Sequence, residues 1–177
     1  MRKVSFTLRR CEPGDEATLA LVGGASFLDA FAETLDGSDL LAHCTKNHSA
    51  ESYAKYLSQP TTRAYVAELL PGKAAVGYIL TCEPDLPLPD LSAADYELKR
   101  IYLLHRFQGT GIGRALMQQA IETTREIGRK RLLLGVYDQN FDAIEFYRKA
   151  GFDEVGERLF QVGSAIHHDA IMARIVD

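Results

Sequence analysis

The residues with the clearest chemical meaning are three glycines in the segment 108–114, which reads Gln-Gly-Thr-Gly-Ile-Gly-Arg. An apolar pattern with helical spacing overlaps and follows it, formed by Ile112, Ala115, Leu116, Ala120 and Ile127. Glycines leave backbone N–H groups uncovered, and a helix start adds unpaired N–H groups and the positive end of the helix dipole. This combination predicts an anion site suited to a diphosphate. A tight turn that binds nothing is the alternative that the residues leave open.

Two well-known phosphate-binding motifs do not fit this segment. The P-loop requires Lys and then Ser or Thr after its last glycine, whereas Arg114 and Ala115 follow Gly113. The dinucleotide fingerprint requires a third glycine three positions after the second, where this chain has Arg114 or Leu116. The failure of both motifs argues against a nucleotide-binding switch.

The elements around the glycine segment alternate between strand and helix. The pattern predicts a strand at 97–104, a helix at 111–127, a strand at 131–136 and a helix from about 140 to 150. Two final strands are expected around 152–162 and 168–176. The glycine segment therefore lies between a strand and a helix, where backbone N–H groups can converge on an anion.

The first half of the chain indicates a strand, a group of helices and a hairpin. The strand is expected at 4–10 and the helices between 15 and 58, with a break at Gly23-Gly24 and new starts after Gly37 and near Ser49. Strand-forming residues at 62–70 and 74–82 surround Pro71-Gly72, a turn signal, and predict an antiparallel hairpin. The segment 83–90 contains three of the six prolines and predicts an exposed loop.

Length and composition limit the class of protein. With 177 residues, 46% of them hydrophobic, the chain is expected to form a single domain over 1–177. The net charge of -4 and the lack of a basic run argue against nucleic acid as a partner. No apolar stretch approaches the roughly 20 residues of a membrane span, and residues 1–7 hold no secretion signal, so a cytoplasmic location follows. The scattered Cys11, Cys44 and Cys82 predict free thiols and no metal site.

The segment 108–113 resembles the Gln/Arg-x-x-Gly-x-Gly/Ala signature of the GCN5-related N-acetyltransferase (GNAT) superfamily. Residues 140–152 are similar to the Asn-x-x-Ala-x-x-Phe-Tyr-x-x-x-Gly-Phe pattern of that superfamily. Upstream, residues 101–103 resemble the strand that in the family splays from its neighbour and binds the pantetheine arm of the cofactor. The resemblance covers about half of the chain, in the family's order.

The resemblance implies an α/β GNAT fold, with a mixed central sheet of about six to seven strands, a splayed central strand pair and about four helices. It also implies acetyl-CoA as the co-substrate, without a metal. The residues that it assigns to the cofactor are Ile101, Tyr102, Leu103, Gln108, Gly109, Thr110, Gly111, Ile112, Gly113, Arg114, Asn140 and Tyr147. Asn140 has a second expected role as the cap of the helix that follows it.

Acetyl transfer from a thioester to an amine needs a neutral amine, a donor for the developing oxyanion and a proton for the departing thiolate. The resemblance assigns the oxyanion contact to a backbone N–H near Leu103 or Leu104, and the proton to the hydroxyl of Tyr147. A tyrosine pKa near 10 suits a thiolate leaving group. A Tyr147 that only packs against the sheet is the alternative.

The general base is expected to be Glu97, acting through a water from the strand that carries the acetyl-binding backbone. A surface carboxylate at a strand start is the competing interpretation. Strand alternation places one set of side chains on each face, with Glu97, Lys99, Ile101 and Leu103 opposite Leu98, Arg100, Tyr102 and Leu104. His167 and His168 have suitable pKa values, but adjacent strand residues face opposite sides, so at most one of them could serve.

A closer similarity, to spermidine/spermine acetyltransferases of the PaiA type, is carried by residues 31–34, 97–103 and 160–172. It implies a small-molecule amine, a polyamine, as the acceptor. The acids that permit a cationic substrate are Asp29, Glu33, Asp36, Asp85, Asp90, Asp95 and Glu97. Protein N-termini, other amines, and a regulatory module that binds acetyl-CoA without turnover are the alternatives. The exposed final strands are compatible with a homodimer.

Overall fold

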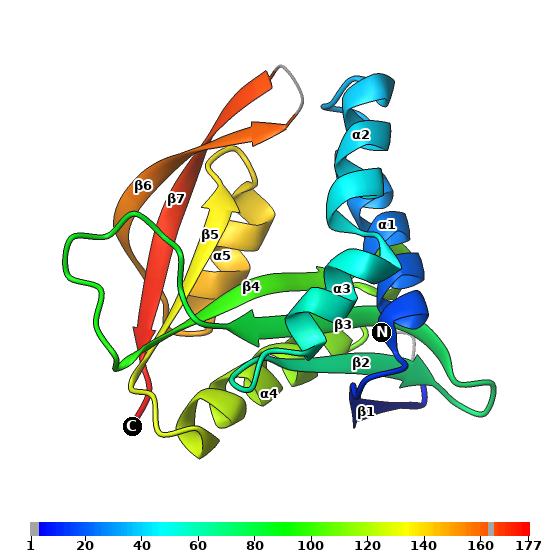
Figure 1. Cartoon of the computed structure of the whole chain (residues 1–177), viewed down its shortest axis with the longest axis horizontal. Helices are drawn as coiled ribbons and strands as arrows, with labels where there is room; N and C mark the ends of the chain where they lie inside the picture. The colour runs from blue at the N-terminus through cyan, green and yellow to red at the C-terminus, as the bar shows by residue number, and fades with distance from the viewer. Residues whose placement is uncertain (1–3, 163–164) are drawn as a thin grey trace.

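The computed structural model describes residues 4–162 and 165–177 and has one seven-stranded sheet in the order β1-β2-β3-β4-β5-β7-β6 (Figure 1). The strands are β1 (Phe6–Arg10), β2 (Arg63–Leu69), β3 (Ala74–Cys82), β4 (Asp95–Leu103), β5 (Arg131–Tyr137), β6 (Asp153–Val162) and β7 (Ala165–Ile175). The helices are α1 (Glu16–Phe31), α2 (Gly37–Asn47), α3 (Ala50–Leu57), α4 (Ile112–Glu126) and α5 (Phe141–Lys149), with a 3₁₀ turn at His105–Phe107. The expected α/β class and mixed sheet are confirmed.

Helices cover both faces of this sheet, and each covering layer has its own apolar core. On one face, α4 and α5 bury residues such as Leu116 and Ile144 against the strands. On the other face, α1 and α3 bury Leu19, Val22 and Tyr53 against β2 and β3. Within the described residues, no helix combines the length and the apolar character needed to cross a bilayer.

The helix α1 runs without interruption through Gly23-Gly24, so the expected break there is wrong. A Cβ on Gly23 would lie 2.2 Å from the Tyr53 hydroxyl oxygen and 2.6 Å from His48 Nδ1. Glycine is therefore required at this position so that the buried side chains of α3 and its preceding turn can approach the helix. The tertiary packing outweighs the roughly 1 kcal/mol by which an interior glycine disfavours a helix.

The proline-rich segment after β3 is a loop, as expected, but it is not exposed throughout. Leu86 is buried against Leu133, Ile171 and Ala173, which belong to β5 and β7. The loop therefore covers part of the sheet face on which α1–α3 lie, because it fills the space that these helices leave over the C-terminal strands.

The centre of the sheet opens between β4 and β5. These parallel strands pair only from Asp95 opposite Arg131 to Glu97 opposite Leu133. Beyond Glu97, β4 continues along β3 while β5 continues along β7, and the two strands diverge (Figure 1). The expected splayed strand pair is thus present, and it leaves one edge of β4 without a neighbouring strand.

Candidate functional site

The glycine segment forms a tight connection between the 3₁₀ turn and α4. Gly109 and Gly111 have positive φ angles of 70° and 93°, and Gly111 is the N-cap residue of α4. Side chains with a Cβ rarely adopt such angles, so glycine is needed at both positions. Thr110 fixes the turn between them, since its hydroxyl donates to the Phe107 carbonyl (2.5 Å).

Backbone N–H groups converge at this turn. The Gln108 N–H donates to the His105 carbonyl and the Ala115 N–H donates to the Gly111 carbonyl. Between them, the N–H groups of residues 109–114 have no acceptor in the part of the chain that the structure describes. Unpaired N–H groups at a helix start are typical of anion sites, and the diphosphate site at this turn stays a prediction.

Gly113 brings the turn close to two other elements of the site. A Cβ on this glycine would lie 3.8 Å from Leu103 Cδ2 and 4.0 Å from the Phe146 ring. These distances are ordinary van der Waals contacts, so the first turn of α4 packs beside both the end of β4 and α5. The motif segments that lie far apart in the sequence are therefore neighbours.

The unpaired edge of β4 presents the backbone of Ile101 and Leu103. The Leu104 N–H donates to the Val76 carbonyl (3.0 Å), and the Tyr102 carbonyl faces Gly77, so these groups point toward β3. Backbone groups alternate along a strand, which directs those of Ile101 and Leu103 to the side from which β5 has diverged. Of the two N–H groups expected near the oxyanion, that of Leu104 is already bonded.

A bulge in β4 changes which side chains share a face. Leu80 pairs with Arg100 but Thr81 pairs with Leu98, so Lys99 is an extra residue in the strand. Consequently Leu98, Ile101 and Leu103 pack in the core beneath α4, whereas Tyr102 packs in the core beneath α1 and α3. The expected regular alternation from Glu97 to Leu104 is wrong, because it ignored the register imposed by β3.

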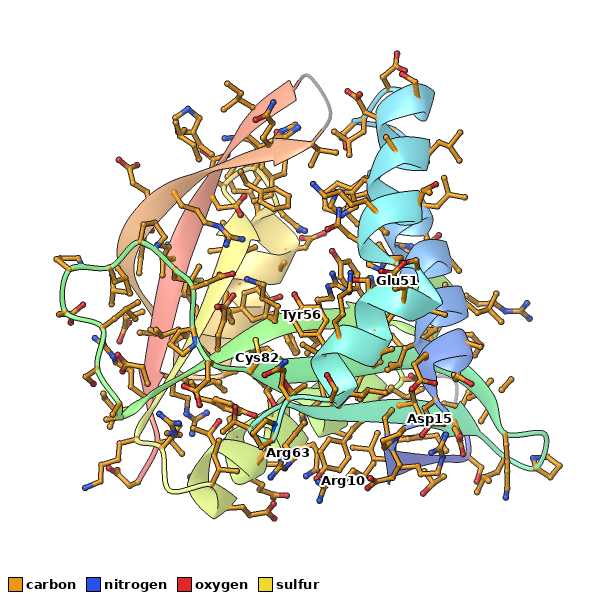
Figure 2. All side chains as sticks on the ribbon, viewed as in Figure 1. Arg10, Asp15, Glu51, Tyr56, Arg63 and Cys82 are labelled. Carbon is orange, nitrogen blue, oxygen red and sulfur yellow. The ribbon has the colours of Figure 1, made fainter. Side chains whose placement is uncertain are left out.

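Glu97 lies at the point where β4 and β5 separate, and its side chain is 2% exposed. The interpretation of a surface carboxylate is therefore wrong. The Asp85 N–H donates to Glu97 Oε2 (3.0 Å) and Lys99 Nζ lies 3.3 Å from Oε1. Burial raises the pKa of this carboxyl above its ordinary value, and the Lys99 ammonium opposes that rise. Its strand partner Cys82 marks the place in Figure 2.

Tyr147 is buried on α5, with 8% of the residue exposed. Its ring contacts Phe146 and Phe152 at centroid distances of 5.5 and 6.1 Å. Burial raises the pKa of the Tyr147 hydroxyl above 10, and the neighbouring Tyr102 hydroxyl acts in the same direction. The side chain is thus both a packed aromatic and a neutral hydroxyl at the level of the splayed strands.

Asn140 caps α5, as its position in the sequence predicts. Its side-chain carbonyl accepts a hydrogen bond from the Ala143 N–H (3.1 Å). The two histidines near the end of the chain lie on β7, opposite β6. The His167 ring lies edge-on to Tyr137 at 5.2 Å, close to the carboxyl end of β5, whereas His168 is exposed.

The sequence analysis missed a group of aromatic and basic side chains between α1–α3 and β4. The members are Phe27, His43, His48, Tyr53, Tyr56, Tyr78, Arg100 and Tyr102. Two short hydrogen bonds link His48 Nδ1 to the Tyr53 hydroxyl (2.8 Å) and that hydroxyl to Tyr78 (2.7 Å). Arg100 is one of four charged residues in β4, so its position along the chain gave no distinct signal of this group.

The acids expected to attract a polyamine do not gather at one place. Asp90 and Asp95 both pair with Arg131 at the start of β5. Asp85 pairs with Lys99, and Asp29 accepts from the His105 N–H (2.6 Å). Asp90 and Asp95 share one arginine, Asp85 shares Lys99 with Glu97, and Asp29 has a backbone partner, so these acids are spread over separate places.

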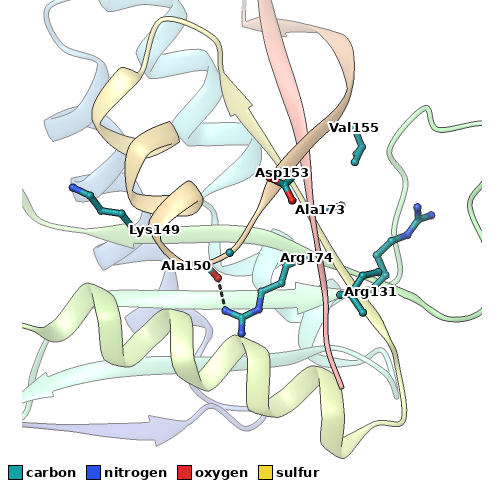
Figure 3. A pocket seen from close by; sticks show the side chains of 9 residues that line it. Arg131, Lys149, Ala150, Asp153, Val155, Ala173 and Arg174 are labelled. Atoms are coloured by element: carbon teal, nitrogen blue, oxygen red, sulfur yellow. Dashed lines mark hydrogen bonds between the residues drawn. The ribbon is translucent and has the colours of Figure 1, made fainter.

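A shallow pocket of 650 Å³ lies away from the glycine turn, at the start of β5 and the end of α5 (Figure 3). Arg131 and Arg174 line it, but the first pairs with acids and the second donates to the Ala150 carbonyl. The splayed ends of β4 and β5 are at the opposite end of these strands. We therefore place the candidate site at the glycine turn and not in this pocket.

Comparisons with known proteins bear on the family of the chain. The model of the acetyltransferase (GNAT) family matches residues 29–152. An uncharacterized N-acetyltransferase of Mycobacterium tuberculosis is 32% identical over 160 residues, which cover 90% of this chain and 97% of the relative. The crystal structure of the PaiA N-acetyltransferase from Thermoplasma acidophilum in complex with coenzyme A has a TM-score of 0.76 and 22% identity, covering 97% of this chain and 99% of that chain. A spermine/spermidine N(1)-acetyltransferase of Bacillus subtilis is 33% identical over 61 residues, 34% of this chain and 40% of its own length.

Proposed function

Because the chain belongs to the GNAT family of acetyltransferases, we propose that it transfers the acetyl group of acetyl-CoA to the primary amine of a small molecule. The observation that carries the proposal is the row of unpaired N–H groups at residues 109–114, beside the unpaired edge of β4. Together they offer an anion cradle and an extended hydrogen-bonding edge, which a diphosphate joined to an amide-containing arm requires.

In this proposal the backbone of residues 109–114 binds the diphosphate. Gln108 and Arg114 lie at the two ends of the glycine segment. The backbone of Ile101 and Leu103 binds the pantetheine arm. The Leu103 N–H is the donor to the thioester oxygen, since that of Leu104 is bonded to Val76. Tyr102 takes part in cofactor binding through its side chain, because its backbone carbonyl faces Gly77 on β3.

Tyr147 donates the proton that the thiolate takes up as the carbon–sulfur bond breaks. Its raised pKa keeps the hydroxyl protonated until negative charge forms on sulfur. Asn140 orients this helix by capping it and completes the set of residues expected at the cofactor.

Glu97 accepts a proton from the amine through a water as the carbon–nitrogen bond forms. A raised pKa makes its carboxylate a better base than an exposed glutamate. Lys99 and the Asp85 N–H hold the carboxylate in place and limit the rise of its pKa.

The polyamine acceptor stays a prediction, supported by the similarity to the Bacillus subtilis enzyme over 34% of this chain. The distribution of acids weighs against it, because Asp85, Asp90 and Asp95 have basic partners.

Two measurements test the proposal. Calorimetric titration with CoA should show binding, and release of the CoA thiol should accelerate when an amine acceptor is added to acetyl-CoA and protein. A protein that does not bind CoA would overturn the proposal. Binding without acceleration by any amine in a broad panel would instead support the regulatory module.

A further inference from the structure

Arg100 stands at the centre of the aromatic group that faces α1–α3. Its guanidinium carbon lies 5.0 Å from the centroid of the Tyr53 ring and 5.3 Å from that of Tyr56. Tyr56 projects from α3 into the space above the sheet (Figure 2). Arg100 and Tyr102 are alternate residues of β4 beyond the bulge, so they share the face on which an acceptor can approach the strand.

Among the residues that the structure describes, the guanidinium group of Arg100 lacks an anionic partner. Its Nη1 atom is buried and has no hydrogen-bond acceptor among residues 4–162 and 165–177, and no carboxylate in that part of the chain forms an ion pair with it. Arg158 on the same side of the sheet is a useful contrast, because it pairs with Asp169 at 3.0 Å. A buried charge without a partner destabilises a protein. A ligand that pairs with the Arg100 guanidinium would offset this cost.

The groups that surround Arg100 do not neutralise it. Burial and the Arg100 charge lower the pKa of His48 to about 3 and that of His43 to about 4, so both rings are neutral at pH 7. Tyr53, Tyr78 and Tyr102 are neutral hydroxyls. The nearest carboxylate of the site, Glu97, is engaged with Lys99. Lys99 also pairs with Asp85, so its charge is engaged, and within the described residues Arg100 is left without an acceptor for its Nη1 atom.

We propose that Arg100 binds a carboxylate of the acceptor, so that the substrate is an amino-acid-like amine and not a polyamine. This inference rests on the proposed function and specifies its acceptor class. The planar guanidinium can form two parallel hydrogen bonds to a carboxylate, and the surrounding rings exclude water from them. Arg100 is three residues before Leu103 on the same strand, about 10 Å along it, so both border the same stretch of β4.

The first experiment compares matched acceptors in the thiol-release assay. Alanine, methionine, phenylalanine and glutamate are each assayed beside the corresponding α-amide, with spermidine and spermine as cationic acceptors. We expect at least one amino acid to exceed its amide by about tenfold or more in kcat/KM, the effect of a charge-assisted pair. Amides or polyamines that equal or exceed every amino acid overturn the inference and leave the acetyltransferase standing.

The second experiment removes the charge. Arg100→Met should lower kcat/KM for the preferred amino acid by about tenfold or more and change that for its amide by less than about threefold. Arg10→Met is the matched control, because Arg10 is half exposed and pairs only with Glu12 in the region described. An equal loss for acid and amide overturns the inference, since Arg100 then supports the site without recognising the carboxylate.

A stability measurement separates ligand binding from a structural role. If Arg100 serves to bind a ligand and does not stabilise the free protein, Arg100→Met removes a buried unpaired charge and should raise Tm by about 2–4 °C. N-acetylmethionine, titrated calorimetrically in the presence of CoA, should bind the wild type more tightly than Arg100→Met by about tenfold. A lowered Tm together with unchanged binding of N-acetylmethionine shows that the arginine is only a clamp for Tyr53 and Tyr56.

The two proposals fail in different ways. Absence of CoA binding overturns the proposed function, and the carboxylate site at Arg100 is then tested by titrating N-acetylmethionine without CoA. If Arg100→Met abolishes that binding, the carboxylate site is supported in that case as well. CoA binding and turnover without any preference for a carboxylate overturn the carboxylate site alone.

Discussion

Gly113 at the start of α4 lies directly against Leu103 at the end of β4, since a Cβ on the glycine would be 3.8 Å from Leu103 Cδ2. This contact brings the turn proposed to bind the diphosphate next to the edge of β4 from which β5 has diverged. It leaves room for a Cβ. Gly113 is therefore a place where the proposed cofactor site can be changed without breaking the fold.

We predict that Gly113→Val lowers CoA affinity by about tenfold or more, because the side chain covers the N–H groups that the diphosphate needs. Calorimetric titration with CoA measures the effect, and Tm should stay within a few degrees. Gly37→Val is the matched control, since Gly37 also begins a helix and has nothing within 4 Å of its Cβ position. Unchanged CoA affinity in folded Gly113→Val would falsify the assignment of the cradle.

Tyr147→Phe should reduce kcat by about 10²-fold or more while the Kd of acetyl-CoA changes little, because the hydroxyl acts only when charge builds on sulfur. The phenyl ring keeps the packing against Phe146 and Phe152. Steady-state turnover gives kcat, and a binding titration gives the Kd of acetyl-CoA. Tyr65→Phe on β2 serves as the control, and equal turnover in both variants would reduce Tyr147 to a core aromatic.

The rate should fall as the pH drops through the pKa of Glu97, since only the carboxylate accepts a proton. That pKa is raised, so the acidic limb of kcat/KM lies above the range of an exposed glutamate. Lys99→Met removes a neighbouring positive charge and should move the limb to still higher pH. Glu97→Gln should remove the limb and most of the rate. If the acidic limb of kcat/KM does not move in Lys99→Met, the general base is a group other than Glu97.

The neighbouring glycines of α1 should respond to alanine in opposite directions. Gly23→Ala places a Cβ 2.2 Å from the Tyr53 hydroxyl and should cost about 2–4 kcal/mol of unfolding free energy. Gly24→Ala has no contact closer than 4.0 Å and should stabilise the helix by about 0.5–1 kcal/mol. Urea denaturation of both variants measures this. Similar effects at the two positions would mean that the His48–Tyr53 pair can move aside.

The parts of the fold that follow from short segments were predictable from the sequence. Pro71-Gly72 predicted the hairpin of β2 and β3, and Ser49 predicted the start of α3, where it accepts from the Ser52 N–H. The glycine segment predicted the start of α4 to within one residue. Each of these signals acts through neighbours a few residues away, so one sequence contains it.

The features that the sequence did not reveal depend on partners far along the chain. The bulge at Lys99 is imposed by β3, and the continuity of α1 at Gly23 depends on Tyr53. Leu86 is buried because β5 and β7 lie beneath its loop. The lack of an ion pair at Arg100 is also a property of the assembled fold, because no spacing along the chain indicates which acids have other partners.

The short pairing of β4 with β5 divides the sheet into two blocks that are each antiparallel and nearly consecutive in sequence, β1–β4 and β5–β7. The direct strand pairing between these blocks is limited to three residue pairs, and the other links are α4, the loop that carries Leu86 and the ion pairs of Arg131. Each block is therefore a candidate for a separate cooperative unit. A ligand that occupies the opening between them touches both, and its binding energy then opposes their separation. Amide hydrogen exchange should accordingly slow in both blocks together when CoA is present, far beyond the residues that the ligand contacts.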